Sequence, residues 1–145
     1  MLNRISVMLM LAFSCGTLLG ALGEHALSAQ KSTVSRVELI NAELAEFPGK
    51  EARLYTVELA PGAITPRHRH PGHYFSYVLE GTGVLEEDGK PERSLKPGTV
   101  YYAHAAPGQA ATWHSVWNTS ETLPLRTLAI LITDKGKPGT VFDKP

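Results

Sequence analysis

The chain has 145 residues, of which 43% are hydrophobic and 19% are charged. This length and composition predict a single folded domain and argue against disorder over most of the chain. Lysine and arginine together number 14, as do aspartate and glutamate, and this balance argues against a nucleic-acid binder that works through a broad basic surface. The 13 glycines and 10 prolines predict many turns, which disfavours a helical bundle.

The first 28 residues have the features of an export signal peptide. Arg4 supplies a positive charge near the start, and residues 5–22 are uncharged and mostly apolar. The small residues Ala26 and Ser28 occupy the two small-residue positions of a candidate cleavage site. We therefore predict a protein that is exported to the periplasm or the extracellular space.

Two alternatives remain open for this leader. Its uncharged stretch could just span a bilayer, and it would then be retained as an anchor in the inner membrane, the protein's only membrane contact. A lipoprotein attached through Cys15 is the other alternative, although the preceding Ala12, Phe13 and Ser14 match the usual leucine-led motif poorly. Cys15 is the only cysteine, so cleavage after residue 28 would leave a domain without disulfides or thiol chemistry.

The rest of the chain has the pattern of a β protein. Residues 29–52 mix apolar and charged side chains without a helical stripe, and we expect an approach segment that precedes the main domain. From residue 53 to 137, turn signals recur every 8–12 residues or so, which is typical of an all-β sandwich or barrel. The predicted strands lie at about 53–59, 75–79, 84–86, 99–103, 113–117 and 125–132. Residues 138–145 are predicted to be a C-terminal tail.

The histidines are concentrated in this β region. His68 and His70 are two residues apart, so in an extended segment their side chains leave the same face, and Arg67 and Arg69 leave the other. His114 lies in a later predicted strand and is a candidate third ligand. Neutral imidazoles suit Zn, Fe, Cu and Ni. From spacing alone, a metal site and an ordinary packed or solvated pair of histidines remain equally open.

Two motifs resemble those of the cupin superfamily, and in particular small single-domain bacterial cupins with an exported leader. The first is Gly62-x5-His68-x-His70, followed by Pro71-Gly72 and then by Tyr77-Val78-Leu79-Glu80-Gly81. The second is Leu95-x-Pro97-Gly98, with Pro107-Gly108 and His114-x3-Asn118. The resemblance covers most of residues 53–137. It implies a conical jelly-roll β-barrel that holds a divalent metal (Fe, Mn, Ni, Cu or Zn) through His68, His70 and His114.

The first motif departs from the family pattern at one position. The family usually has a glutamate ligand separated from the second histidine by three or four residues, and at these positions this chain has Tyr74 and Phe75. A site of three histidines keeps the full charge of the divalent ion, so it should be more Lewis acidic and should bind the metal more weakly. The fourth position could be taken by His73, by the Tyr74 phenol or by water. Tyr74 is also a candidate general acid or base, although a phenol with a pKa near 10 would need help from the metal.

Further side chains are candidates for the pocket and for a subunit contact. Tyr77 could line the cavity, and so could Gln109, which lies in a second-motif loop longer than is usual in the family. Small cupins are often dimers, so the resemblance implies a homodimer, for which Trp113 and Trp117 are candidate contacts because they face away from His114.

Two classes of function remain open. In the first, the protein is a metal-dependent enzyme that acts on a small organic molecule by dioxygenase-, isomerase- or lyase-type chemistry. In the second, it is a non-enzymatic module that binds a small ligand, with a structural or lost metal. The complete set of three histidines favours the first class, whereas the missing glutamate and the altered second motif favour the second. If a metal is bound, protons should displace it as the pH falls through the imidazole pKa of about 6.5.

Overall fold

A computed structural model describes residues 33–104 and 111–144 of the chain. These residues form ten strands, and no α-helix is assigned among them, so the all-β prediction is confirmed. The strands are β1 (Val34–Glu43), β2 (Lys50–Leu59), β3 (His68–Arg69), β4 (His73–Glu80), β5 (Gly83–Glu87), β6 (Arg93–Leu95), β7 (Val100–Ala103), β8 (His114–Asn118), β9 (Leu125–Asp134) and β10 (Val141–Phe142). The same residues contain no helix that is long and apolar enough to cross a membrane.

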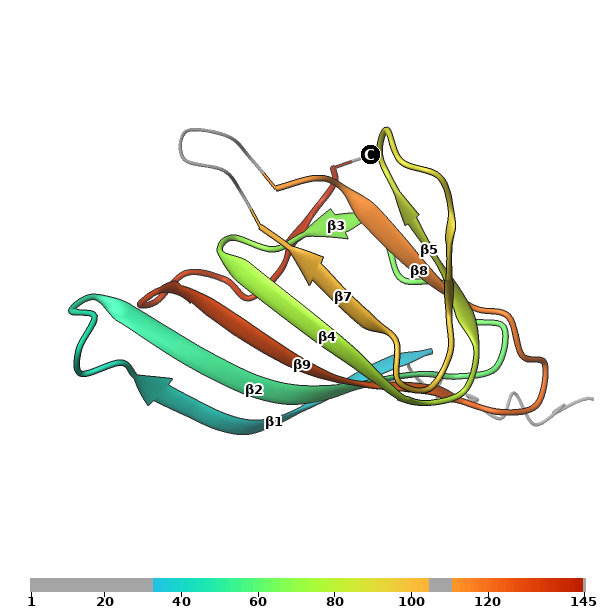
Figure 1. Ribbon diagram of the computed structural model, residues 1–145, viewed down its shortest axis with the longest axis horizontal. Coiled ribbons are helices and arrows are strands. Elements are labelled where there is room, and N and C mark those ends of the chain that lie inside the picture. The colour runs from blue at the N-terminus through green and yellow to red at the C-terminus, as the bar shows by residue number, and fades with distance from the viewer. Residues whose placement is uncertain (1–32, 105–110, 145) are drawn as a thin grey trace, which may run out of the picture. The chain divides into compact units, whose positions relative to one another are not determined.

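The strands form two five-stranded antiparallel sheets. One sheet has the order β1-β2-β9-β4-β7, and the other has the order β10-β3-β8-β5-β6. Figure 1 shows the first sheet as a long curved layer and the shorter strands β3, β8 and β5 facing it. Strands that are distant in sequence are therefore neighbours in each sheet, as they are in a jelly roll.

Alternation along β4 and β9 defines the inner face of the first sheet. In β4, Tyr74, Ser76 and Val78 are buried, whereas the residues between them are exposed. In β9, every second residue from Leu125 to Thr133 is buried in the same way. This period of two is the pattern expected of a sheet with one face toward a core and the other toward solvent.

The core lies between the two sheets, and a buried amide links three segments of the chain. Asn118 is completely buried, and its Nδ2 donates to the carbonyls of Leu59 (3.1 Å), Ala60 (3.0 Å) and Leu123 (2.9 Å). Its Oδ1 accepts a hydrogen bond from the Ser120 backbone N–H. This second-motif asparagine therefore joins the end of β8 to the end of β2 and to the loop before β9.

The barrel extends beyond both boundaries predicted from the sequence. The segment expected to precede the domain contains β1, which pairs with β2 along nearly its whole length. The segment expected to be a tail contains β10, which pairs with β3. The sequence pattern missed β1 because this edge strand is exposed at nine of its ten positions, and an exposed edge strand needs no alternation of apolar and polar residues. Strand β10 is too short to show any alternation.

Candidate metal centre and cavity

The structure brings together the three histidines that the sequence singled out. His68 and His114 face each other in the register of β3 and β8, and His70 follows β3 on the same face as His68. All three side chains are buried. One ring nitrogen from each histidine lies within 4.8 Å of those of the other two, and in the described part of the chain no carboxylate joins this group.

The second ring nitrogen of each histidine is held by the backbone. Nδ1 of His68 lies 2.7 Å from the Pro66 carbonyl, and Nδ1 of His70 lies 2.8 Å from the Gly139 carbonyl. Nδ1 of His114 is 3.4 Å from the Thr112 carbonyl. A carbonyl can only accept, so each Nδ1 carries the proton and each Nε2 keeps its lone pair. This is the tautomer that a histidine needs to bind a metal through Nε2.

Burial keeps these imidazoles neutral. It lowers the pKa of His70 to about 4 against the weaker opposing effect of its hydrogen bond to Gly139. Burial, together with the neighbouring His68 and His70, lowers the pKa of His114 to about 3, and burial also lowers the pKa of His68. At neutral pH three uncharged rings therefore face one another. Nε2 of His70 is buried without a hydrogen-bond partner among the described residues. A buried nitrogen with an unused lone pair is suited to bind a metal cation.

Tyr74 reaches the histidines from the opposite sheet. Its ring stacks on His70 with 3.7 Å between centroids and 6° between planes, and its side chain is buried. Burial raises the pKa of Tyr74 to about 12, although Ser76 and Arg36 both act to lower it. The phenol therefore keeps its proton near neutral pH, and it can donate a hydrogen bond or a proton rather than act as a base. It stands where the cupin pattern has its glutamate.

The other candidates near the metal site do not face the cavity. His73 is exposed and its Nδ1 lies 2.8 Å from the Tyr102 hydroxyl, and Tyr77 is 46% exposed. Both belong to the outward-facing set of β4, because the strand begins directly after Gly72 and places its even-numbered residues inside. Neither side chain therefore lines the cavity. Gln109 lies outside the described residues.

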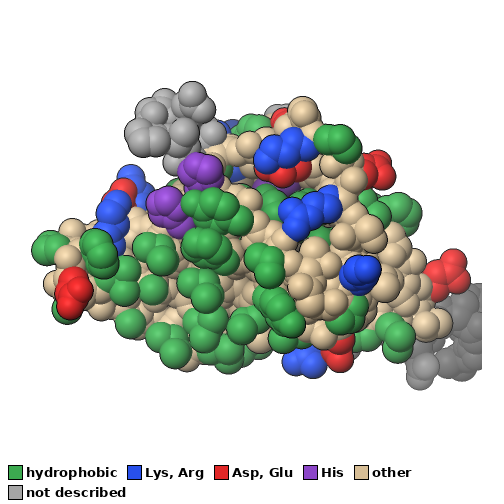
Figure 2. Space-filling model, in the orientation of Figure 1, with side chains coloured by type: hydrophobic (Ala, Val, Ile, Leu, Met, Phe, Trp, Pro, Cys, Tyr) green, Lys and Arg blue, Asp and Glu red, His purple; other side chains and the backbone are tan. Residues whose placement is uncertain are grey.

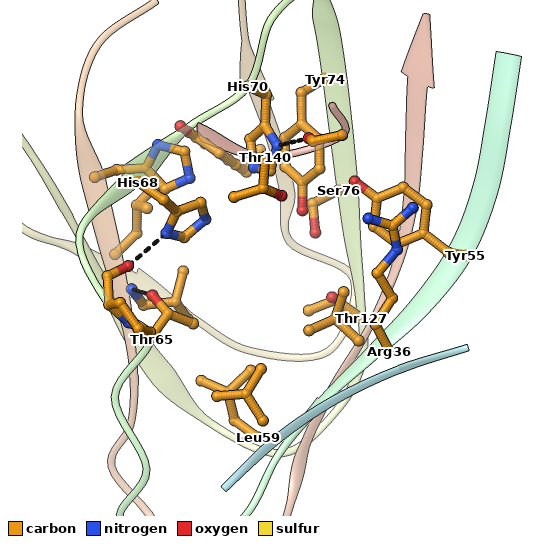
Figure 3. A pocket seen from close by; sticks show the side chains of 18 of the residues that line it. Arg36, Tyr55, Leu59, Thr65, His68, His70, Tyr74, Ser76, Thr127 and Thr140 are labelled. Carbon is orange, nitrogen blue, oxygen red and sulfur yellow. Dashed lines mark hydrogen bonds between the residues drawn. The ribbon is translucent and has the colours of Figure 1, made fainter. Parts of the chain in front are cut away.

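A cavity of about 560 Å³ opens beside the three histidines. Figure 3 shows His68, His70 and Tyr74 along one part of its wall and Tyr55 and Arg36 along another. Much of the remaining wall is apolar and includes Val57, Leu59, Val78, Leu85, Leu95 and Val116. A volume of this size and lining of this kind are typical of sites for small organic molecules.

Sequence reasoning missed Arg36 and Gly139. Arg36 lies in β1, and its side chain lines the cavity. Gly139 lies in the predicted tail, and its carbonyl is the partner of His70. No local pattern marks either residue, because both reach the site only through the pairing of β1 with β2 and of β10 with β3.

Comparison with known proteins agrees with this architecture. The family model described as a cupin domain matches residues 55–131, which is more than half of the chain. A curated relative, auxin-binding protein T85 of Nicotiana tabacum, is 32% identical over an alignment of 87 residues, and the match covers 57% of this chain and 46% of that protein. The chain thus matches about half the length of that relative.

Solved structures show the same fold. The DMSP lyase DddQ of Ruegeria pomeroyi DSS-3 superposes with a TM-score of 0.60 at 21% identity, covering 81% of this chain and 55% of that one. A cupin-like protein of Thermotoga maritima superposes with a TM-score of 0.55 at 29% identity, covering 76% of this chain and 75% of that one. The jelly-roll prediction is confirmed, and the chain belongs to the cupin family.

Proposed function

We propose that the chain is a metal-dependent cupin that acts on a small organic molecule. His68, His70 and His114 would hold one divalent cation through their Nε2 atoms, with Fe, Mn, Ni, Cu and Zn as the candidates. The observation that carries the proposal is the hydrogen bonding of the three buried rings. Each Nδ1 lies within hydrogen-bond distance of a backbone carbonyl, which leaves each Nε2 with a lone pair for a metal. Ring nitrogens of the three histidines lie within 4.8 Å of one another.

The residues around the three histidines would have different roles in the reaction. A bound divalent ion supplies Lewis acidity and an open position for a water molecule or a substrate atom. The apolar wall excludes water from the rest of the ligand, and the Tyr74 phenol would donate a proton next to His70. Dioxygenase-, isomerase- and lyase-type reactions all fit such a site.

A non-enzymatic binding module is the second candidate. Tyr74 fills the place of the family's glutamate with a neutral side chain, which favours weaker metal binding than a site with a carboxylate would have. The curated relative from Nicotiana tabacum is itself named as an auxin-binding protein. In this second case the cavity would hold its ligand without turnover, and the metal would serve structure or binding alone.

Metal content measured by elemental mass spectrometry tests the site. Wild-type protein purified without a histidine tag should contain about one equivalent of a transition metal. His70→Ala should lose most of it, since the substitution removes one of three ligands. His73→Ala is the matched control, because this exposed histidine lies three residues away on the outer face. Equal metal content in wild type and His70→Ala would overturn the ligand assignment.

Substrate consumption separates the two candidates. Metal-loaded and metal-free protein would be incubated with the same mixture of small organic molecules and analysed by mass spectrometry. Metal-dependent disappearance of a compound supports the enzyme. Binding of a compound that is recovered unchanged supports the binding module.

The leader and the outer surface support two further parts of the proposal. Residues 1–28 would direct export to the periplasm or beyond, or else anchor the chain in the inner membrane.

A homodimer would bury the apolar outer face of the first sheet, where Phe75, Tyr77, Leu79, Tyr102 and Ile130 are exposed. Figure 2 shows hydrophobic side chains gathered over this face. An uncharged apolar patch complements itself, as a two-fold symmetric interface requires.

A further inference from the structure

A cationic side chain lies on the cavity wall away from the three histidines. Arg36 projects from β1, and Figure 3 shows it beside Tyr55, across the cavity from His68. Its guanidinium carbon lies 3.8 Å from the centroid of the Tyr55 ring. This cation–π contact holds the guanidinium by its flat face, and its N–H groups at the edge remain available to a ligand.

The charge of Arg36 is poorly compensated within the described residues. Among the described residues, the carboxylate that Arg36 contacts is that of Glu38, at 3.4 Å, and both side chains are partly exposed. A good charge-assisted hydrogen bond is about 2.7–2.9 Å long. Arg53 lies nearby and differs in this respect: its Nε (2.7 Å) and its Nη2 both donate to Oε1 of the buried Glu51, and Nη2 also donates to the Lys137 carbonyl. Arg53 is therefore already paired, whereas Arg36 can still bind an anion.

A hydroxyl beside Arg36 also lacks a partner. The Tyr55 oxygen is buried and has no hydrogen bond among the described residues, and burial raises the pKa of this phenol, so it keeps its proton. A buried O–H without an acceptor is costly, and a bound molecule would remove that cost. An acceptor that could satisfy both Tyr55 and Arg36 is an anionic oxygen. A carboxylate has two such oxygens and matches the planar fork of a guanidinium.

Gly139 joins this cation to the histidines. A Cβ at position 139 would lie 2.9 Å from Nη1 of Arg36, so the guanidinium packs against the glycine backbone. The carbonyl of the same residue accepts the hydrogen bond from His70 Nδ1. The cation and the candidate metal centre are thus parts of one cavity, each in contact with the same residue.

We propose that Arg36 and Tyr55 bind the carboxylate of a small organic acid. Its apolar body would occupy the part of the cavity lined by Val57, Leu59 and Val78, and its far end would face the histidines. This inference rests on the proposed function in one respect: a metal held by the histidines would be the second group that binds the acid. It narrows the substrate class to monocarboxylic acids with an aliphatic or aromatic body.

Calorimetric titration of the purified protein with matched acids and amides tests this subsite. The probes are hexanoate and benzoate, with hexanamide and benzamide as neutral counterparts of the same shape. Both acids should bind wild-type protein at least about tenfold more tightly than their amides, because a hydrogen bond to a charged group is worth about 1.5–3 kcal/mol. Arg36→Gln should weaken acid binding about tenfold or more and leave amide binding unchanged, and Arg36→Lys should fall between wild type and Arg36→Gln.

Arg126→Gln is the matched control, because this arginine is partly exposed and pairs with Glu58 and Glu80 outside the cavity. It should bind the acids as wild type does. Unchanged acid binding in Arg36→Gln, equal binding of acids and amides, or no acid binding by folded wild-type protein would each overturn the proposal.

Metal content measured on the same samples separates this inference from the proposed function. Acid binding that depends on Arg36 in a protein that takes up no metal would support the subsite and overturn the metal centre. One equivalent of metal together with acid binding that is indifferent to Arg36 would support the metal centre and overturn the subsite.

Discussion

The rings of His70 and Tyr74 stack in parallel across the two sheets, 3.7 Å apart. One belongs to the candidate metal centre, and the other occupies the position of the glutamate in the cupin pattern. The contact orients His70 from one side, while its hydrogen bond to the Gly139 carbonyl orients it from the other. Tyr74 therefore packs against one ring of the candidate metal centre, and its hydroxyl, which has a hydrogen bond with Ser76, is the candidate proton donor.

Substitutions of Tyr74 should separate these two roles. Tyr74→Phe keeps the stacked ring and should keep the metal, whereas Tyr74→Ala should bind metal about tenfold more weakly because His70 loses its support. Tyr74→Glu should bind metal more tightly than wild type, because it restores a carboxylate to the site. Competition with a chelator measures all three affinities. Equal affinities in Tyr74→Glu and wild type would mean that position 74 does not reach the metal.

The retention of metal should extend to a lower pH than the sequence alone predicts. An ordinary imidazole would lose its metal as the pH falls through about 6.5, but His70 and His114 have pKa values of about 4 and 3. Protons therefore compete only in more acidic solution, and occupancy should stay level from pH 7 to about 5 and fall below that. Dialysis at each pH followed by elemental analysis measures this. Loss of half the metal at pH 6.5 would contradict the burial argument.

The stability of the metal-free protein should fall over the same acidic range. The folded state holds His70 and His114 at pKa values below 6.5, so the unfolded state binds more protons once the pH drops below 6.5. Each such histidine lowers the free energy of unfolding by about 1.4 kcal/mol per pH unit until its own folded pKa is reached. Urea denaturation at pH 6 and pH 5 should differ by about 2–3 kcal/mol. His70→Gln should show a smaller difference, and an equal difference would exclude His70 as a source.

Asn118 should be essential to the stability of the barrel. Asn118→Ala leaves the carbonyls of Leu59, Ala60 and Leu123 without their donor, and it should lower the free energy of unfolding by about 2–4 kcal/mol. Asn41→Ala is the control, since this asparagine is exposed on β1 and should change stability by less than about 0.5 kcal/mol. Similar losses in the two variants, measured by urea denaturation, would show that the buried amide does not have this role.

The dimer proposal makes opposite predictions for two exposed aromatic residues. Tyr77 lies on the apolar face of the first sheet, whereas Trp117, a contact suggested by the sequence, is exposed on the other sheet. Tyr77→Lys should dissociate the dimer because it places a charge in the interface, and Trp117→Lys should leave it intact. Light scattering measures both masses. The reverse result would move the interface to the second sheet, and a monomeric wild type would exclude a dimer.

Export can be followed with the leader intact and deleted. The full chain should appear in the periplasmic or extracellular fraction, and a chain that lacks residues 1–28 should stay in the cytoplasm. Recovery of the full chain in the membrane fraction would support the anchor instead.

The cluster of three histidines could be predicted from sequence because its members follow the period of a strand and the spacing of the two motifs. His68 and His70 share a face through the two-residue period of a strand, and the paired motifs place His114 opposite them. His73 and Tyr77 could not be placed, because the turn at Gly72 resets the alternation before β4 begins. Gly72 has φ of 135°, and a Cβ there would lie 2.2 Å from the Ile132 carbonyl oxygen, so this turn depends on glycine.

The opposite wall of the cavity could not be predicted for a different reason. Arg36 lies in an exposed edge strand whose sequence has no apolar alternation, and only its pairing with β2 brings it beside Tyr55. Gly139 likewise reaches His70 through the long-range pairing of β10 with β3. Local periodicity carries no information about contacts of this kind.

The most direct test of the metal centre is a crystal structure with anomalous diffraction recorded at the absorption edge of the metal found by elemental analysis. We predict one strong anomalous peak bonded to Nε2 of His68, His70 and His114, at about 2.0–2.2 Å from each. A peak at the exposed His73, or no peak beside the three buried histidines in metal-loaded crystals, would contradict it.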